Sequence, residues 1–217
     1  MPNRYANLLF DLDGTLVDSA PDIIFCVKKA FVEVYGGGAP EVSEGLIGLQ
    51  LKDILFGIDP ALSPGDVRRL TETFRRAYDE CGWPGTRLYG GAEKALLDIK
   101  ASGSRLFLVT NKPAKPTRGI LLKVGLNVFE EVICPDSTEG ARLSKEEMVK
   151  RVIAGRALDP RRTALVGDSE PDMLAARDNG IAAIAVLYGY GSAEKLRALG
   201  PDHTLPDISG LAELINV

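Results

Sequence analysis

Short apolar runs separated by helix-length segments constrain the fold of this chain most. One run occupies residues 5–10, and after residue 92 similar runs recur at 106–109, 132–133, 163–166 and 182–187. Strands that alternate with helices are typical of βαβ units, whose strands lie parallel in one sheet. The sequence therefore predicts an α/β fold with a doubly wound, Rossmann-like parallel sheet.

The segment between the first two runs has a different pattern. Ile23, Val27 and Phe31 recur at helical spacing before Gly36, and a second helical pattern follows further on at Val67, Leu70, Phe74 and Tyr78. Residues 19 to about 82 thus read as helices, with Trp83-Pro84-Gly85 as the return linker. We predict a core domain of residues 1–17 and 90–217, into which an all-helical domain of residues 18–89 is inserted.

Composition excludes several classes of function. The 217 residues include 26 Lys+Arg and 30 Asp+Glu, a net charge of −4, which is a poor match for nucleic acid. A single His excludes most catalytic zinc sites, and three Cys without a C-x-x-C pattern indicate thiols in a reducing compartment. No apolar run approaches the ~18 residues of a membrane span. We expect a cytoplasmic protein with neither nucleic acid nor membrane as a partner.

Polar clusters follow three of the predicted strands. Ligand sites in open α/β sheets lie at the carboxyl ends of strands, where the strand order reverses, so these clusters should converge. Asp11, Asp13 and Asp168 would then place three carboxylates in one small volume, where they repel one another unless a cation lies between them, and Mg²⁺ prefers such oxygen ligands. The clusters are Asp11 with Asp13, Thr110-Asn111-Lys112, and Gly167-Asp168 with Asp172.

The remaining groups suit a phosphoryl group. Thr110 and Asn111 offer hydroxyl, amide and backbone donors, and a lysine such as Lys145 could neutralise phosphate charge. Asp11 can act as a nucleophile through an aspartyl-phosphate. Asp13, two positions further on, can protonate the leaving oxygen and later activate water.

Three segments resemble motifs of the haloacid dehalogenase superfamily, in particular of its phosphatases. Helices directly after the first motif also resemble the C1-type cap of phosphoglycolate phosphatases and β-phosphoglucomutases. The first motif is Phe10-Asp11-Leu12-Asp13-Gly14-Thr15-Leu16-Val17-Asp18-Ser19, the second Leu108-Val109-Thr110-Asn111-Lys112-Pro113, and the fourth Val166-Gly167-Asp168-Ser169-Glu170-Pro171-Asp172.

The resemblance implies a role for each matching residue. It makes Asp11 the nucleophile and Asp13 the acid/base, and an acid at position 13 distinguishes phosphatases from true dehalogenases. It places Mg²⁺ on Asp11, the Asp13 carbonyl and Asp168, and the phosphoryl group on Thr110 and Lys145. For Asp172 we weigh two roles, metal ligation and support of the Asp168 loop. We further expect substrate contacts from Gly14, Thr15, Asn111 and Lys112.

The third motif departs from the pattern of the superfamily. Many relatives carry Lys-Pro-x-Pro, whereas this chain has Leu143-Ser144-Lys145-Glu146-Glu147-Met148. Lys112, Lys115 and Arg142 are therefore alternatives to Lys145 for the phosphate-binding cation.

We expect a Mg²⁺-dependent phosphatase that acts on a small phosphorylated metabolite, with 2-phosphoglycolate as the named substrate. Selection of that substrate should lie in the helical insertion, and residues 45–52 are the candidate loop. A mutase, a pyrophosphatase or a nucleotidase on the same scaffold are the alternatives. An alternative from another class is a receiver-like signalling module, which would be shorter and would lack the helical insertion. The sequence leaves both a monomer and a homodimer open.

Overall fold

A computed structural model of the chain describes residues 3–140 and 142–215. The chain divides into two units, one of residues 1–18 with 88–217 and one of residues 19–87. The first unit contains the sheet, and the second consists of helices and their connections.

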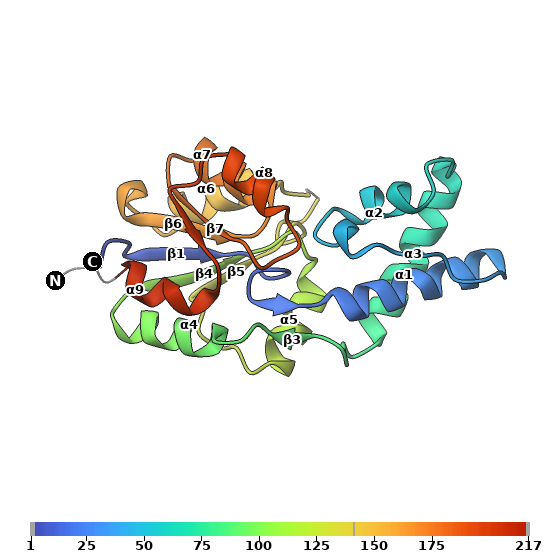
Figure 1. The fold of residues 1–217 in the computed structure, drawn as a ribbon, viewed down its shortest axis with the longest axis horizontal. Helices are drawn as coiled ribbons and strands as arrows, with labels where there is room; N and C mark the ends of the chain where they lie inside the picture. The colour runs from blue at the N-terminus through green and yellow to red at the C-terminus, as the bar shows by residue number, and fades with distance from the viewer. Residues whose placement is uncertain (1–2, 141, 216–217) are drawn as a thin grey trace. The chain divides into compact units, whose positions relative to one another are not determined.

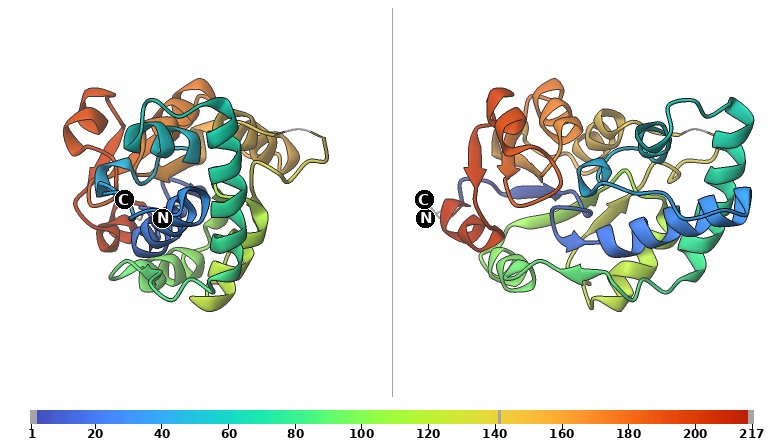
Figure 2. Two further views of the ribbon diagram at one scale, coloured as in Figure 1. Left: turned by 90° about the vertical axis from the view of Figure 1, so that its right-hand side faces the viewer. Right: turned by 45° about the vertical axis from the view of Figure 1, so that its right-hand side comes forward.

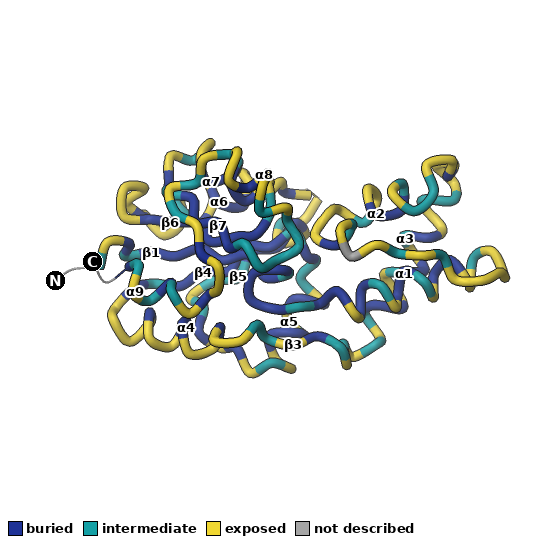
Figure 3. Tube along the Cα trace, viewed as in Figure 1, coloured by how far each residue is buried: buried dark blue, intermediate teal, exposed yellow. Residues whose placement is uncertain are grey.

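Six strands form the sheet of the first unit, and every pairing in it is parallel. Their order is β5-β4-β1-β6-β7-β8, with β1 in the middle (Figure 1). β1, β4, β6 and β7 are almost wholly buried (Figure 3) because helices cover both faces, which explains their continuous apolar runs. The strands are β1 Asn7–Phe10, β4 Arg105–Val109, β5 Glu131–Ile133, β6 Thr163–Gly167, β7 Ala182–Val186 and β8 His203–Leu205.

Helices lie on both faces of this sheet. α6 and α7 pack against each other on one face, and α4 lies on the other face with α9 (Figure 2). The helices of this unit are α4 Ala92–Ala101, α5 Ala114–Lys123, α6 Lys145–Gly155, α7 Glu170–Asp178, α8 Ala193–Ala198 and α9 Leu211–Ile215, with 3-10 turns at Pro160–Arg162 and Ile208–Gly210.

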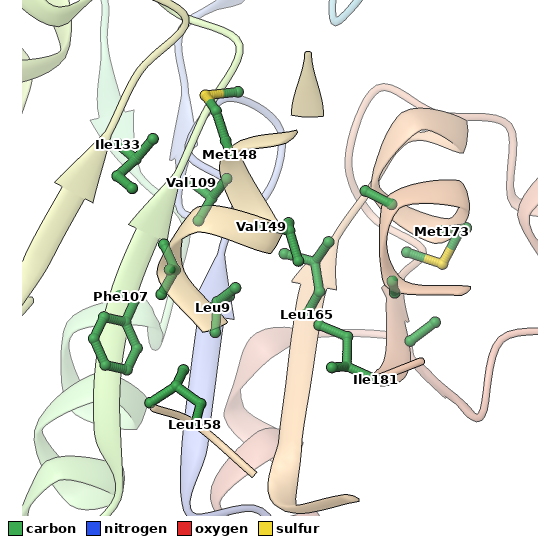
Figure 4. Packing of buried hydrophobic residues seen from close by; sticks show 14 of the residues in the cluster. Leu9, Phe107, Val109, Ile133, Met148, Val149, Leu158, Leu165, Met173 and Ile181 are labelled. Atoms are coloured by element: carbon green, nitrogen blue, oxygen red, sulfur yellow. The ribbon is translucent and has the colours of Figure 1, made fainter. Parts of the chain in front are cut away.

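One hydrophobic cluster joins the sheet to α6 and α7. Leu9 and Leu165 of the central strands are fully buried there, together with Met148 and Val149 of α6 and Met173 of α7 (Figure 4). Close packing of this kind fixes α6 and α7 relative to the strand ends. The residues that follow β1, β4 and β6 are therefore attached to a closely packed part of the structure.

The second unit contains α1 Ala20–Tyr35, a 3-10 turn at Glu44–Leu46, α2 Leu51–Ile58 and α3 Pro64–Glu80. α1 and α3 pack together through apolar faces. Gly36 caps the C-terminus of α1 with a left-handed φ of +67°, as is common for the residue that follows a helix. The chain passes between the units in a small sheet formed by β2 Val17–Asp18 and β3 Arg87–Leu88.

The predicted doubly wound α/β fold is confirmed, and its details differ at several places. The first strand starts at Asn7, and the strand at 203–205 was not predicted. The helix at 51–58 lies within the segment read as helical, but its bounds were not predicted. The loop expected at residues 45–52 is shorter, since a 3-10 turn and the start of α2 occupy part of it. Within the described residues, no helix has both the length and the apolar character that a membrane crossing requires.

Candidate active site

The candidate site lies where the strand order reverses. β1 lies between β4 and β6, with Phe10 level with both Leu108 and Val166. The Asp11 amide continues the ladder by donating to the Val166 carbonyl at 2.9 Å. The segments after β1, β4 and β6 therefore start at one edge of the sheet, which is the usual ligand edge of an open α/β sheet.

Lys145 and Asp11 form a buried ion pair at this edge. The Lys145 Nζ donates to Asp11 Oδ1 at 2.6 Å and to the Val109 carbonyl at 2.9 Å, and it lies 2.8 Å from Asp172 Oδ1. Burial alone lowers the pKa of Lys145, but the carboxylates of Asp11 and Asp172 outweigh it and raise that pKa. Lys145 is therefore held as a cation beside Asp11.

The sequence around Lys145 explains its position. Ser144 is the N-cap of α6, and its hydroxyl accepts from the Glu147 amide at 3.2 Å while Glu147 Oε2 accepts from the Ser144 amide at 2.7 Å. This reciprocal capping box starts the helix at Lys145. Because Met148 and Val149 anchor the same helix in the core, the Lys145 side chain is directed from a fixed backbone.

Three carboxylates cluster beside this lysine. Oxygen atoms of Asp11, Asp168 and Asp172 lie within 4.8 Å of one another, and all three residues are buried. Burial raises the pKa of Asp11 despite the opposing effect of Lys145, and burial followed by the charge of Asp172 raises the pKa of Asp168. Burial is the largest cause of both raised pKa values, and the charges of neighbouring carboxylates add to it.

A second ion pair joins Asp13 to Lys112. The Lys112 Nζ donates to Asp13 Oδ2 at 2.8 Å, and the two side chains are only 6% and 17% exposed. Counted as fully ionised, the four carboxylates and two ammonium groups have a formal charge of −2 at this edge. Carboxylate oxygens with that excess charge fit a hard divalent cation such as Mg²⁺.

Asp172 also supports the loop that carries Asp168. Its Oδ2 accepts from the Ser169 amide at 3.1 Å and from the Ser169 hydroxyl at the start of α7. A Cβ at Gly167 would lie 2.3 Å from the Asp172 Cγ, so glycine at that position permits the approach. Asp172 thus combines a capping contact with the ion pair to Lys145.

Gly14 and Thr15 lie against Asp168. The Thr15 hydroxyl donates to Asp168 Oδ1 at 3.0 Å. Gly14 has a φ of +80°, and a Cβ there would lie 2.2 Å from Asp168 Oδ2, so both backbone conformation and space require glycine. The first motif therefore packs directly onto the carboxylate of the fourth.

The remaining predicted residues follow β4. Thr110 is buried, and its hydroxyl accepts from the Lys112 amide at 3.2 Å, which shapes the turn that carries Lys112. Asn111, between them, is half-buried. All ten residues predicted for the site thus belong to the first unit, after β1, β4 and β6 or at the start of α6.

Comparison with known proteins identifies the family. Residues 8–186 match the family described as haloacid dehalogenase-like hydrolase. The chain belongs to this family.

Relatives of this hydrolase cover almost its whole length. A 5'-nucleotidase of Pseudomonas aeruginosa is 31% identical over 217 residues, which is 98% of this chain and 96% of that protein. A phosphoglycolate phosphatase of Vibrio cholerae is 31% identical over 223 residues, covering 97% of this chain and 96% of that protein. The crystal structure of a predicted phosphoglycolate phosphatase from Haemophilus somnus has a TM-score of 0.85 at 26% identity, covering 97% and 98% of the two chains. The predicted resemblance to the superfamily is confirmed.

Sequence reasoning missed one group of residues at this hydrolase's candidate site. The Tyr190 amide donates to Asp168 Oδ2 at 2.8 Å, and the Tyr188 hydroxyl donates to the Thr15 carbonyl at 2.6 Å. Both tyrosines follow β7, one strand further along the sheet than the predicted clusters. The alternating Tyr188-Gly189-Tyr190-Gly191 directly after a predicted strand was the signal that could have found them.

Proposed function

We propose that the chain is a Mg²⁺-dependent phosphatase that hydrolyses a small phosphomonoester through an aspartyl-phosphate on Asp11. The observation that carries this proposal is the buried Asp11, 2.6 Å from the Lys145 ammonium and clustered with Asp168, with Asp13 two residues further on. One carboxylate is then available to attack phosphorus while a second, held separately by Lys112, handles protons.

The first half of the reaction transfers the phosphoryl group to the protein. An Asp11 carboxylate oxygen forms a bond to phosphorus as the bond from phosphorus to the alcohol oxygen breaks. Asp13, protonated in the substrate complex and released from its ion pair with Lys112, gives its proton to that leaving oxygen, which departs as the alcohol. Lys145 and donors after β4, at Thr110 and Asn111, balance the negative charge on the phosphoryl oxygens.

The second half releases phosphate. Asp13, now ionised, accepts a proton from water as the water oxygen attacks phosphorus, and the Asp11 carboxylate leaves. Both aspartates return to their starting protonation states, and the net change is hydrolysis of one phosphoester bond. Asp11, the Asp13 carbonyl and Asp168, with Asp172 beside them, would hold Mg²⁺, which would supply positive charge that offsets the repulsion between carboxylates and phosphate.

The substrate we propose is 2-phosphoglycolate. Its support is the similarity to phosphoglycolate phosphatases over nearly the whole chain. The Pseudomonas 5'-nucleotidase favours nucleoside monophosphates as the second candidate. Membership in a hydrolase family argues against the receiver-like module.

We further propose that residues 19–87 act as a cap that selects the substrate and that the enzyme works in the cytoplasm. Its proposed partners are small phosphorylated metabolites. A selecting role for the helical unit is consistent with a core unit that contains all ten predicted groups for phosphoryl chemistry.

The test is phosphate release by the purified full chain with Mg²⁺. The panel contains 2-phosphoglycolate, nucleoside 5'-monophosphates, pyrophosphate and sugar phosphates, each assayed with and without a chelator. We expect the highest kcat/KM for 2-phosphoglycolate and loss of turnover with the chelator. Preference for a nucleotide would select the second candidate, and isomerisation of a sugar phosphate without phosphate release would indicate a mutase. Hydrolysis that survives the chelator would contradict the proposed metal dependence.

A further inference from the structure

The loop after β7 packs directly onto the candidate metal site. Tyr188, Gly189, Tyr190 and Gly191 form this segment, which we name the tyrosine loop. The Tyr190 main-chain amide donates to Asp168 Oδ2 at 2.8 Å, opposite the Thr15 hydroxyl, which donates to Oδ1 at 3.0 Å. A carboxylate that accepts one bond on each oxygen cannot rotate freely, and it retains lone pairs for a cation.

The glycines of the tyrosine loop permit this approach. A Cβ at Gly189 would lie 2.3 Å from the Gly14 carbonyl oxygen and 2.4 Å from Asp168 Oδ2. A Cβ at Gly191 would lie 1.9 Å from the Asp168 carbonyl oxygen. Since no side chain fits at either position, the loop backbone can contact Asp168 and the first motif only with glycine there.

The hydroxyl groups of the two tyrosines bind the segment after β1. Tyr188 donates to the Thr15 carbonyl at 2.6 Å, and Tyr190 donates to Asp18 Oδ1 at 2.9 Å. The Tyr188 ring also packs edge-to-face on Tyr89, with centroids 4.8 Å apart. Burial raises the pKa of Tyr188, so its hydroxyl stays protonated and remains a donor.

These contacts form a closed ring of interactions around Asp168. The ring runs from Asp168 to the Tyr190 amide, along the loop to Tyr188, from the Tyr188 hydroxyl to the Thr15 carbonyl, and from the Thr15 hydroxyl back to Asp168. Thr15 lies two residues after Asp13 in the first motif, so the ring couples the first and fourth motifs. Groups that orient metal ligands in this way commonly change metal affinity ten- to a hundredfold when they are removed, as an order of magnitude.

We propose that Tyr188 and Tyr190 are positioning residues, which hold Asp168 and the first motif in register and thereby set the affinity of the site for Mg²⁺. The inference rests on the proposed function, because it takes the Asp168 site to be a magnesium site. Removal of the two hydroxyls should leave the glycine backbone and the Tyr190 amide in place but release the loop from the segment after β1.

The experiment compares Mg²⁺ binding by the metal-free full chain and by the Tyr188→Phe/Tyr190→Phe double variant, using isothermal titration calorimetry without substrate. The matched control is Tyr35→Phe, which removes a hydroxyl from an exposed tyrosine of the helical unit. We expect the dissociation constant for Mg²⁺ to rise about tenfold or more in the double variant and to stay unchanged in the control. The Mg²⁺ concentration for half-maximal turnover should rise equally, with kcat recovering at saturating Mg²⁺.

The outcomes separate this inference from the proposed function. A double variant that binds Mg²⁺ as tightly as wild type would overturn the inference. This holds also if its thermal stability is reduced, because reduced stability with unchanged affinity indicates a purely structural role. If the double variant does not fold, the single Tyr190→Phe variant is compared in the same way. Wild-type Mg²⁺ binding without hydrolysis of any phosphomonoester would contradict the proposed function but leave the positioning role supported by the affinities. Absence of Mg²⁺ binding to wild type would overturn both.

Discussion

Lys145 is a buried cation whose position depends on two carboxylates. Its ammonium contacts Asp11 and Asp172 at 2.6 and 2.8 Å, and the lysine side chain is 4% exposed. A buried ion pair adds little to the free energy of unfolding compared with apolar residues of similar size. Removal of one partner, however, leaves an unpaired buried charge, which lowers that free energy strongly. The lysine therefore affects stability as well as chemistry.

We predict that Lys145→Met lowers the free energy of unfolding by about 3–5 kcal/mol, because two buried carboxylates lose their counter-charge. Adding Asp172→Asn removes one of those carboxylates, so the double variant should be less destabilised than the sum of the single variants by about 0.5–3 kcal/mol. Urea unfolding of the four proteins measures this coupling. Strict additivity would show that the pair does not interact as described.

His203 provides a pH-dependent test away from the site. Burial lowers the pKa of this only histidine below 6.5, and Arg4 lowers it further against the smaller effect of Asp202. The unfolded chain therefore binds a proton near pH 6.5 while the folded chain does not. Stability from His203 is present above that pH and is lost as the pH falls from about 6.5 to the folded pKa.

We predict that wild type loses more stability than His203→Gln between about pH 7.5 and pH 5. Urea unfolding at the two pH values gives this difference, in which contributions from other groups cancel. The folded pKa itself is measurable from the single histidine resonance in a proton NMR titration. A folded pKa above 6.5 would contradict the burial argument.

At the scale of elements, two capping boxes of the same kind start α3 and α6. Ser63 pairs with Asp66 in α3, and Ser144 pairs with Glu147 in α6. Only the second lies next to a candidate site residue, because Lys145 is the first residue of α6. The two caps therefore form a matched pair for separating helix stability from positioning.

We predict that Ser144→Ala and Ser63→Ala each lower helix stability by about 1 kcal/mol, since each loses a cap. Only Ser144→Ala should lower kcat, because it loosens the backbone that aims Lys145 at Asp11. Thermal unfolding and steady-state phosphate release of both variants test this. Equal losses of kcat would show that the effect on activity follows from stability alone.

Elements with strong local signals were predictable, and those without them were not. The runs at 106–109 and 163–166 cover all but one residue of β4 and of β6, and the patterns around Ile23 and Leu70 lie on α1 and α3. β8 has only three residues, too few for a periodic signal. α2 lacks a side-chain cap at Gln50 that would mark its start, although its apolar residues recur at helical spacing.

Site residues with a clear local sequence signal were predictable as well, and contacts without such a signal were not. Asp11, Lys145 and Asp168 meet because they follow strands or start a helix in the predicted βαβ series. The Lys112 contact to Asp13 and the tyrosine contacts to Asp168 depend on side-chain directions and on the order of strands, which periodicity does not specify. The expected contact of Lys112 with substrate stays a prediction, and its ion pair with Asp13 is an additional contact that the sequence did not indicate.

At the scale of the whole molecule, two short strands connect the units. Val17–Asp18 and Arg87–Leu88 pair with each other, and within the helical unit Asp22 accepts from the Gly85 and Thr86 amides at 2.8 and 2.6 Å. The two chain segments that connect the units are thus hydrogen-bonded to each other. Such paired linkers favour movement of a unit as one body over independent bending of each chain segment.

We predict that Mg²⁺ together with orthovanadate, a phosphate mimic, reduces the radius of gyration in small-angle X-ray scattering, because the proposed cap closes over the ligand. Asp168→Asn, which weakens the proposed metal site, should show no such change under the same conditions. An unchanged radius of gyration in wild type, with vanadate inhibiting turnover, would contradict closure of the helical unit.

Formation of a phosphoenzyme on Asp11 tests the central claim most directly. The full chain is mixed with Mg²⁺ and its best substrate, quenched in acid within the first turnover and analysed by peptide mass spectrometry. We predict a phosphate adduct on the peptide that contains Asp11, which hydroxylamine removes as expected for an acyl phosphate, and none in Asp11→Asn, whose turnover falls at least about a thousandfold. A phosphate adduct on another residue, or wild-type turnover by Asp11→Asn, would contradict the proposed mechanism.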